Sequence, residues 1–188
     1  IMKYIIPGAL KRNGFNMLQN AEYGYTDKVR HKLDRGVDPN FQDGQGVTAL
    51  MRAARGGFFD TVELLLERGA YPNIRGDIGG GAGMTALIIG IRNIWDLHHD
   101  GHPVDRWREY KRAGYKKPYD ETASYNIAKS LLNHGADPNI QGELEYTALI
   151  LAVDQGLLEI VELLLEGGAD PNIQNRDGKT ALIFAAQK

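Results

Sequence analysis

The fold of this chain is decided by the stretch Asp43–Asn73, DGQGVTALMRAARGGFFDTVELLLERGAYPN. Its closing phrase, Gly-x-Tyr/Asp-Pro-Asn, occurs four times, and the four prolines are separated by 33, 66 and 33 residues. They are Pro39, Pro72, Pro138 and Pro171. A phrase that returns at a fixed period indicates an array of stacked repeats, because one such unit cannot close a hydrophobic core alone.

The first half of the stretch predicts a turn followed by a helix. Asp43–Gly46 begins with an aspartate and is rich in glycine, which suits a tight hairpin-like turn that needs positive φ angles. Thr48 is a favourable residue at a helix start. Ala53 and Ala54 keep this helix slim, so neighbouring copies can approach closely, and Gly57 ends it.

The second half predicts another helix and a loop. Val62, Leu65 and Leu66 fall at i, i+3 and i+4, which gives this helix one apolar stripe. Gly69 can adopt the left-handed conformation just beyond the helix, and Pro72 prevents the helix from continuing. The predicted unit is therefore turn, helix, turn, helix and loop.

This unit resembles the ankyrin repeat. Three copies carry both of its phrases: Thr48–Leu50 with Gly69–Asn73, Thr85–Leu87 with Gly135–Asn139, and Thr147–Leu149 with Gly168–Asn172. A degenerate first copy covers about residues 15–40, and a fifth begins at Thr180–Leu182. The resemblance implies an all-α fold, an ankyrin-like helical-repeat solenoid with β-hairpin-like finger loops.

The period also predicts the domain organisation. We expect an N-terminal extension over residues 1–14 and a single ankyrin-repeat domain over residues 15–188. The approximate copies are 15–41, 42–74, 75–141 with an insertion at 96–124, 142–174, and a partial copy at 175–188. The first copy is the most polar, as an end repeat that faces water must be, so we predict that it is the N-terminal cap.

The copies depart from the family pattern at two positions of the opening phrase, and at the first an alanine follows the threonine where the family usually has a proline. The family usually has a histidine directly after the leucine of the opening phrase, and that histidine bonds to the threonine. Here the position holds an apolar residue in each copy: Met51, Ile88, Ile150 or Ile183. We therefore expect the Thr-to-His hydrogen bond to be missing and apolar contacts between neighbouring copies to take its place.

The third copy is irregular in its finger and in both of its helices. The finger, Arg75–Gly83, is enlarged and rich in glycine, but it lacks the lysine of a phosphate-binding glycine loop, so we expect a flexible finger. Apolar spacing over Leu87–Trp95 predicts that the first helix runs on past its usual end. Asp120 or Thr122 can cap a second helix that begins early.

The insertion between these helices carries aromatic and basic residues. Pro103 can start and Gly114 can stop a short helix with Trp107 and Tyr110 on one side. Aromatic side chains often dominate interface energy. Two interpretations stay open: a hook that recognises a protein, and a hook that packs these rings on its own stalk.

Two other chemistries for the insertion are not expected. A metal site is suggested by His98, His99, Asp100 and His102. Structural metal sites normally take ligands from two separated elements, so we predict no metal here. Basic residues around Trp107 suggest nucleic-acid binding, but Asp105 and Glu109 offer local ion pairs, which favours a solvated helix face.

Composition excludes further classes of function. The chain has 188 residues, a formal net charge of −2 and no cysteine, so it has no disulfide, thiolate nucleophile or sulfur-ligated zinc. Its apolar runs are shorter than the roughly 20 residues that cross a bilayer, and its start makes a poor secretory signal. We expect a cytoplasmic protein without membrane contact. Ser124 and Ser130 lack a neighbouring base and His134 suits a helix end, so we expect no enzyme and no cofactor.

The resemblance implies that a partner meets the fingers and the exposed side of the first helices. Together with the insertion, the candidate partner-binding residues are Tyr23, Gln45, Val47, Arg52, Arg55, Arg92, Trp107, Tyr110, Glu143, Leu144, Tyr146, Asp154, Arg176 and Lys179. Leu144 and Tyr146 carry the most weight, because an exposed apolar group lowers solubility unless something covers it.

Charge along the first helices suggests one property of the partner. Glu22, Arg55, Arg92 and Asp154 hold equivalent positions in four copies, so an acidic group of the partner would fit the middle, aided by Arg52. The predicted function is a non-enzymatic protein-protein interaction module with a protein partner of unknown identity. The alternative is binding of a metal ion, a phosphate-bearing small ligand or nucleic acid at the insertion.

Overall fold

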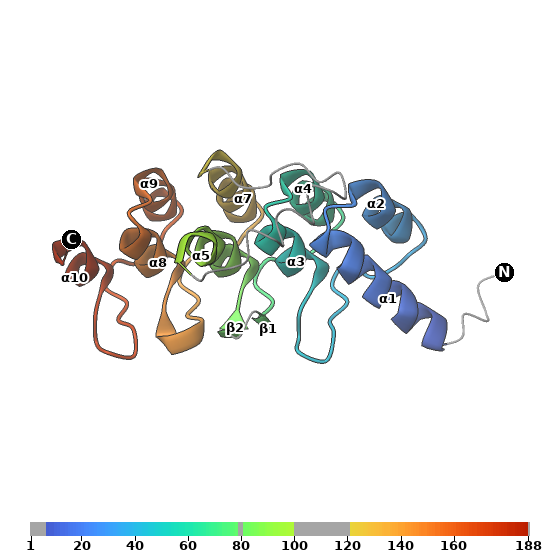
Figure 1. Ribbon diagram of the computed structural model, residues 1–188, viewed down its shortest axis with the longest axis horizontal. Coiled ribbons are helices and arrows are strands. Elements are labelled where there is room, and N and C mark those ends of the chain that lie inside the picture. The colour runs from blue at the N-terminus through green and yellow to red at the C-terminus, as the bar shows by residue number, and fades with distance from the viewer. Residues whose placement is uncertain (1–6, 79–80, 100–120, 188) are drawn as a thin grey trace.

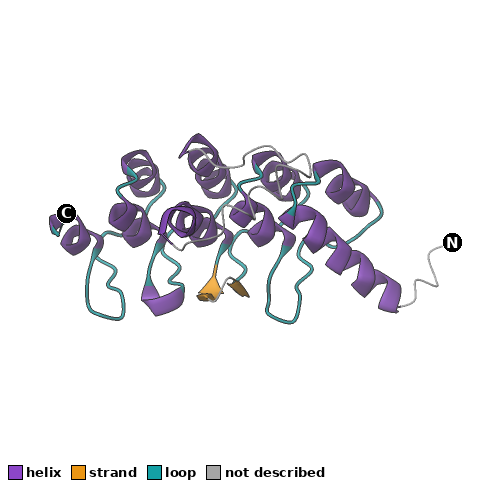
Figure 2. Ribbon diagram, in the orientation of Figure 1, coloured by secondary structure: helices purple, strands orange, loops and turns teal. Residues whose placement is uncertain are grey.

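The computed structural model describes residues 7–78, 81–99 and 121–187, and these form two layers of helices with loops projecting below them. The first helix of each copy lies in the lower layer of Figure 1, and the second helix lies above it. Helices of one layer contact their neighbours in order along the array. Figure 2 shows that the described part is mostly helical, as predicted for an all-α repeat solenoid.

The helices follow the period of the sequence. The lower layer consists of α1 (Pro7–Glu22), α3 (Ala49–Gly56), α5 (Ala86–His99), α8 (Ala148–Gln155) and α10 (Ala181–Ala186). The upper layer consists of α2 (Thr26–Asp34), α4 (Phe59–Glu67), α7 (Glu121–Asn133) and α9 (Leu158–Glu166). The projecting loops contain β1 (Gly76–Ile78), β2 (Gly81–Met84) and the 3-10 turn η1 (Glu143–Glu145).

Three of the four opening phrases start their helix with a threonine side-chain cap, while Thr180 makes no such bond. The Thr48 Oγ1 accepts a hydrogen bond from the Met51 N–H at 3.2 Å, and the Thr147 Oγ1 accepts one from the Ile150 N–H at the same distance. Gly57, with φ 70°, ends α3 in the left-handed conformation. The predicted start and end of the first helix are therefore confirmed, and each cap is worth about 1 kcal/mol.

Apolar residues replace the family histidine as expected. Met51, Ile88 and Ile150 are buried. Met51 lies against Gly76 of the next copy, and Ile88 lies against Gly142 of the copy that follows it. Burial of such a side chain contributes roughly 1.5–3 kcal/mol, so these contacts join consecutive copies through the core.

A second join between copies runs through the asparagine of each closing phrase. The Asn40 Nδ2 donates to the Gly69 carbonyl at 3.0 Å, while the Asn40 Oδ1 accepts from the Tyr71 N–H at 2.7 Å. One side chain thus binds both partners in the loop of the next copy. Gly69 has φ 85°, a conformation that glycine adopts without strain.

The same pair of bonds recurs at the next two closing phrases. Asn73 binds the Gly135 carbonyl at 2.9 Å and the Asp137 N–H at 2.8 Å. Asn139 binds the Gly168 carbonyl at 3.0 Å and the Asp170 N–H at 2.7 Å. We call Asn40, Asn73 and Asn139 the asparagine ladder. The Nδ2 of Asn172, in the fourth phrase, bonds instead within its own loop, to the Asp170 Oδ1 at 3.0 Å.

Both helices of the irregular third copy are longer than usual, as predicted, and α7 has 13 residues against 9 in α4. α5 has 14 residues against 8 in α3, so the first helix does run past its usual end. α7 begins at Glu121, which places Thr122 inside the helix, so the prediction that Thr122 caps it is wrong. Asp120 and the short helix expected between Pro103 and Gly114 lie outside the described residues.

The first copy begins earlier than the repeat pattern alone indicated. α1 starts at Pro7, so residues 7–14, expected to belong to an extension, are continuous with the first helix. Pro7 is favourable in the first turn of a helix, because that turn leaves its N–H groups without helical partners. Met17, Leu18 and Ala21 of this helix are buried, as the apolar spacing of the first copy requires.

The ladder predicts a matched difference in stability. Replacement of Asn139 by alanine removes two hydrogen bonds between copies, so we expect the free energy of unfolding to fall by about 1–2 kcal/mol. Asn172→Ala removes only a bond within one exposed loop and should cost less than about 0.5 kcal/mol. Urea unfolding followed by circular dichroism measures both, and equal losses would contradict the ladder.

Candidate functional site

Four fingers project below the lower layer, side by side in copy order (Figure 1). They are finger 1 (residues 43–47), finger 2 (76–84), finger 3 (142–146) and finger 4 (175–179). In finger 2, β1 pairs with β2 in an antiparallel hairpin. In the other three, the backbone N–H of the first residue donates to the carbonyl of the last, at 3.1, 2.9 and 3.0 Å in chain order. All four are therefore closed, hairpin-like loops, as expected.

Fingers 1 and 4 share a turn that is stabilised by a side-chain oxygen. In finger 1 the Asp43 Oδ1 accepts the N–H groups of Gln45 and Val47, both at 3.0 Å. In finger 4 Asn175 holds the equivalent position, and its Oδ1 accepts from the Asp177 and Lys179 N–H groups in the same way. The fourth residue of each finger is a glycine with positive φ, Gly46 at 76° and Gly178 at 72°. The side-chain acceptor satisfies two backbone N–H groups and the glycine adopts a positive φ without strain, so this turn forms at a low cost in free energy.

Finger 3 has lost both of these features. Its first residue is Gly142, which has no side-chain acceptor, and its fourth residue is Glu145, which adopts φ 62°. Leu144 is also left-handed, with φ 54°. Such a conformation costs a residue other than glycine about 1–3 kcal/mol. The backbone of finger 3 is therefore strained at two consecutive positions.

Packing explains the glycine that begins finger 3. A Cβ added to Gly142 would lie 3.2 Å from both the Ile88 Cδ1 and the Met84 Sδ, which is tighter than ordinary contact. A side chain here would therefore have to displace the apolar contact between the third and fourth copies by a few tenths of an ångström. Glycine at this position also removes the acceptor that stabilises the turn in fingers 1 and 4.

Hydrogen bonds join the fingers into one ledge. The Asp77 N–H of finger 2 donates to the Gln45 carbonyl of finger 1 at 2.9 Å. The Arg176 N–H of finger 4 donates to the Leu144 carbonyl of finger 3 at 3.0 Å. The Arg75 guanidinium binds the carbonyl of Gln141, which precedes finger 3, at 2.9 Å. Side chains on the fingers are therefore presented by a connected backbone.

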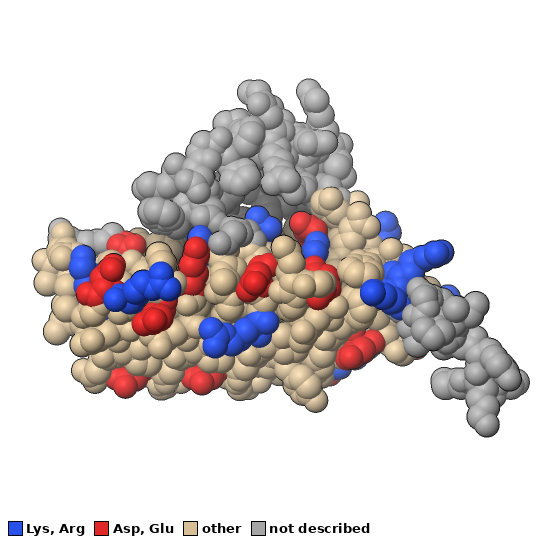
Figure 3. All heavy atoms as spheres, turned by 90° about the horizontal axis from the view of Figure 1, so that it is seen from below, with Lys and Arg blue, Asp and Glu red and all other residues tan. Residues whose placement is uncertain are grey.

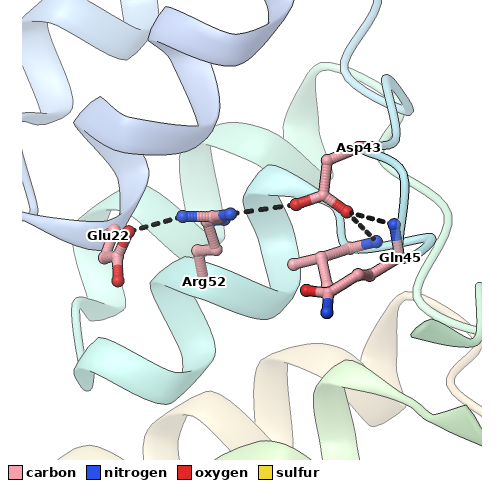
Figure 4. Close-up of polar contacts among 5 residues, drawn as sticks. Glu22, Asp43, Gln45 and Arg52 are labelled. Atoms are coloured by element: carbon pink, nitrogen blue, oxygen red, sulfur yellow. Dashed lines mark hydrogen bonds and ion pairs between the residues drawn. The ribbon is translucent and has the colours of Figure 1, made fainter. Parts of the chain in front are cut away.

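An ion-pair chain links the first copy to finger 1 (Figure 4). The Arg52 guanidinium lies between two carboxylates, 2.5 Å from the Glu22 Oε2 and 2.9 Å from the Asp43 Oδ2. Glu22 ends α1 and Arg52 belongs to α3, so the chain crosses from one copy to the next. All three side chains are at least partly shielded from water, which strengthens the pairing.

A second ion pair ties finger 3 to the third copy. The Arg92 guanidinium of α5 binds the Glu143 Oε2 at 2.6 Å. A Cβ at Gly81 would approach both groups, at 2.5 Å from the Arg92 Nη1 and 2.9 Å from the Glu143 Oε2. Gly81 of finger 2 therefore leaves the space in which this pair forms.

Asp43 has a perturbed acidity. Burial alone would raise the pKa of this carboxyl group. The Gln45 and Val47 N–H groups and the Arg52 guanidinium favour the charged form, and together they lower the pKa below 3.8. The carboxylate of Asp43 is therefore built into the turn of finger 1 as an anion.

The structure describes twelve of the fourteen predicted contact residues. Exposed are Gln45, Leu144 and Arg176, and partly exposed are Tyr23, Arg52, Arg55, Arg92, Glu143, Tyr146, Asp154 and Lys179. Val47 is only 1% exposed, so the prediction that it contacts a partner is wrong. Closure of finger 1 turns this side chain into the core. Trp107 and Tyr110 lie outside the described residues.

The expectation of an acidic partner group loses its basis. Arg52 and Arg92 already bind carboxylates of this chain, so a partner carboxylate would have to displace one of them. Residues 142–187 contain eight acidic and two basic side chains, an excess of negative charge in the last two copies. Figure 3, seen from the finger side, shows acidic groups interspersed with basic ones along this face.

Sequence reasoning missed one aromatic contact beside finger 3. The rings of Tyr146 and Phe184 lie 5.7 Å apart, with Phe184 on α10, and the Lys179 Nζ lies 5.6 Å from the Phe184 ring. We call Leu144, Tyr146 and Phe184 the finger-3 patch. Phe184 and Arg52 hold the same position in their repeats, four residues after the threonine, and each contacts the preceding copy. This shared repeat position was the signal in the sequence for the contact of Phe184 with Tyr146.

The described residues hold neither a cluster of metal ligands nor a membrane-spanning helix. Within residues 7–78, 81–99 and 121–187, no three His, Asp or Glu side chains gather as a metal site would require. Of the suggested metal ligands, Asp100 and His102 lie outside these ranges. No helix in this part of the chain has the length and apolar character needed to span a membrane.

Comparisons with known protein families agree with the architecture. A model described as "Ankyrin repeats (3 copies)" matches residues 9–100, and one described as "Ankyrin repeats (many copies)" matches residues 131–185. A comparison with curated proteins found no match. The two family matches leave out residues 101–130, which include most of the predicted insertion.

The acidity of Asp43 predicts how stability depends on pH. The pKa of Asp43 is lower in the folded chain than in the unfolded one. The charged carboxylate therefore stabilises the fold at pH values above the unfolded-state pKa, and this stabilisation is lost as the pH falls through the folded-state pKa. Asp43→Asn keeps the turn acceptor, as Asn175 does in finger 4, but loses the charge. We expect the variant to be less stable at pH 7 and to match the wild type near pH 2. Denaturant unfolding measured across this range tests this, and a constant difference would contradict it.

Proposed function

Because the chain belongs to the ankyrin-repeat family, we propose that it is a non-enzymatic protein-protein interaction module. Ankyrin repeats are generally protein-protein interaction modules. The proposed contact surface is the lower layer of helices and the four fingers. The partner is a protein, and neither a cofactor nor catalysis is part of the proposal.

The observation that carries the proposal is the connected ledge of fingers. Finger 1 is hydrogen-bonded to finger 2, and finger 3 to finger 4, while Arg75 connects finger 2 to Gln141 in the loop before finger 3. Side chains held by such a framework lose little conformational freedom on binding, which leaves more of the contact energy for affinity. Long side chains on separate mobile loops would lose more.

An exposed leucine supports the same surface. Leu144 is 50% exposed at the tip of finger 3, although the sequence could place a small or polar residue there, as Asp177 shows in finger 4. Single exposed leucines are common. This one also adopts a strained conformation, and strain of this kind concentrates where a protein binds or reacts.

Other predicted contacts are proposed with less structural support. Gln45 and Arg176 lie exposed on fingers 1 and 4 and belong to the proposed surface. Trp107 and Tyr110 of the insertion stay a prediction from sequence. So does the alternative in which the insertion binds a metal ion, a phosphate-bearing ligand or nucleic acid, because its residues lie outside those described.

Paired leucine variants test the proposed surface. We expect Leu144→Ser to reduce capture of a partner from cell lysate by at least about tenfold, the loss of one energetically important contact. Leu158→Ser is the matched control, because Leu158 is 74% exposed on α9 in the upper layer. Capture is quantified by mass spectrometry.

A third variant separates the fingers from the insertion. Deletion of residues 100–120 should leave most of the capture intact if the fingers form the main surface. Loss of capture in this deletion together with full retention in Leu144→Ser would contradict the proposed surface and place the contact on the insertion.

A further inference from the structure

Finger 3 is held in place by contacts from neighbouring copies as well as by its own turn, in which the Glu145 N–H donates to the Gly142 carbonyl at 3.1 Å. It lacks the Asx acceptor of fingers 1 and 4, and its two left-handed residues are a leucine and a glutamate. The Arg92 guanidinium holds the Glu143 carboxylate, and the Arg176 N–H holds the Leu144 carbonyl. These two contacts from neighbouring copies compensate for the unfavourable backbone.

The residues at the tip of finger 3 differ in chemistry from those at the tips of fingers 1 and 4. Gly46 and Gly178 occupy the register of Glu145, and Gln45 and Asp177 occupy the register of Leu144. Fingers 1 and 4 thus expose polar residues and glycine, whereas finger 3 exposes an apolar side chain beside a carboxylate. Glu143, on the other side of Leu144, is already neutralised by Arg92.

Two partly exposed aromatic rings lie between the tip of finger 3 and α10. Tyr146 follows Leu144 by two residues, and its ring contacts that of Phe184. These three residues, the finger-3 patch, expose apolar atoms that an apolar side chain of a partner can cover. Aromatic groups of this kind contribute strongly to binding when a partner covers them.

Charge around the patch indicates the chemistry of that partner. Glu145 is exposed directly beside Leu144, and Asp177 is exposed on finger 4 together with Arg176. Residues 142–187 as a whole carry eight acidic side chains against two basic ones, and three of the acidic ones, Glu159, Glu162 and Glu166, lie on α9 in the upper layer. The Lys179 ammonium group lies 5.6 Å from the centre of the Phe184 ring, so this ring already has a cation of the chain beside it. The group left for a basic side chain of a partner is the exposed Glu145 carboxylate.

From these observations we infer that finger 3 determines the specificity of the array, and that it binds a peptide segment with an apolar side chain next to lysine or arginine. The apolar side chain packs on the finger-3 patch and the basic group pairs with Glu145. This inference rests on the proposed function, because it names the partner's chemistry at the same surface.

Selection from random linear peptides displayed on phage tests the inference. The wild-type chain should enrich peptides that combine apolar with basic residues. The comparison variant is Leu144→Asp with Glu145→Gly, which copies the Asp177-Gly178 pair of finger 4 and so keeps a turn that this fold already contains. We expect the enriched peptides to bind this variant at least about tenfold more weakly. Raising the salt concentration should weaken binding to the wild type.

The outcomes separate the inference from the proposed function. Peptides that bind both chains equally, or enrichment of acidic peptides, would overturn the inference while leaving an interaction module in place. If the wild-type chain enriches no peptide and captures no protein partner, the proposed function fails as well. Competition between an enriched peptide and a captured partner would support both.

Strain in finger 3 has a readout that needs no partner. Glu145→Gly removes the penalty of a left-handed glutamate, so we expect the melting temperature to rise by about 2–4 °C. The matched change in finger 4, Gly178→Glu, introduces that penalty and should lower it. A lower melting temperature for Glu145→Gly would show that finger 3 is not strained, and would remove this part of the inference.

Discussion

The structure depends on one side chain per copy that binds two backbone groups of the next. Each ladder asparagine accepts an N–H and donates to a carbonyl in the following loop, as Asn40 does with Tyr71 and Gly69. This fixes the distance and direction between successive closing phrases, and hence between the helices that the loops connect. Apolar contacts such as Met51 against Gly76 then fill the space whose width the ladder sets.

The fingers inherit this regular spacing but not a uniform chemistry. Fingers 1 and 4 satisfy their own turns, while finger 3 relies on contacts from Arg92 and Arg176. A repeat protein tolerates such an exception because each copy is stabilised by its interfaces with neighbouring copies, and these interfaces offset an unfavourable conformation in one loop. Finger 3 exposes the apolar side chain of Leu144 at the position where fingers 1 and 4 have polar residues.

Local and periodic features, including the apolar contacts of Met51 and Ile88 with the next copy, could be predicted from sequence, but the polar contacts between copies could not. Periodicity predicted the helices, their threonine caps and the longer α5, because these depend on neighbouring residues. It did not predict that Arg52 reaches Glu22, 30 positions earlier, or that closure of finger 1 buries Val47. Those outcomes depend on how loops and side chains from two copies meet, so the candidate site was predicted less well than the fold.

The ladder also has a consequence for how this architecture accepts foreign segments. Asn73 binds Gly135 although 62 positions separate them, so two full periods of chain serve as a single structural step. The ladder spans this copy with the same pair of bonds as the others, and the entropy of closing a longer connection between α5 and α7 grows only logarithmically with its length. The junction is thus a natural point for grafting new sequence, whether by evolution or by design, without resetting the pitch of the stack.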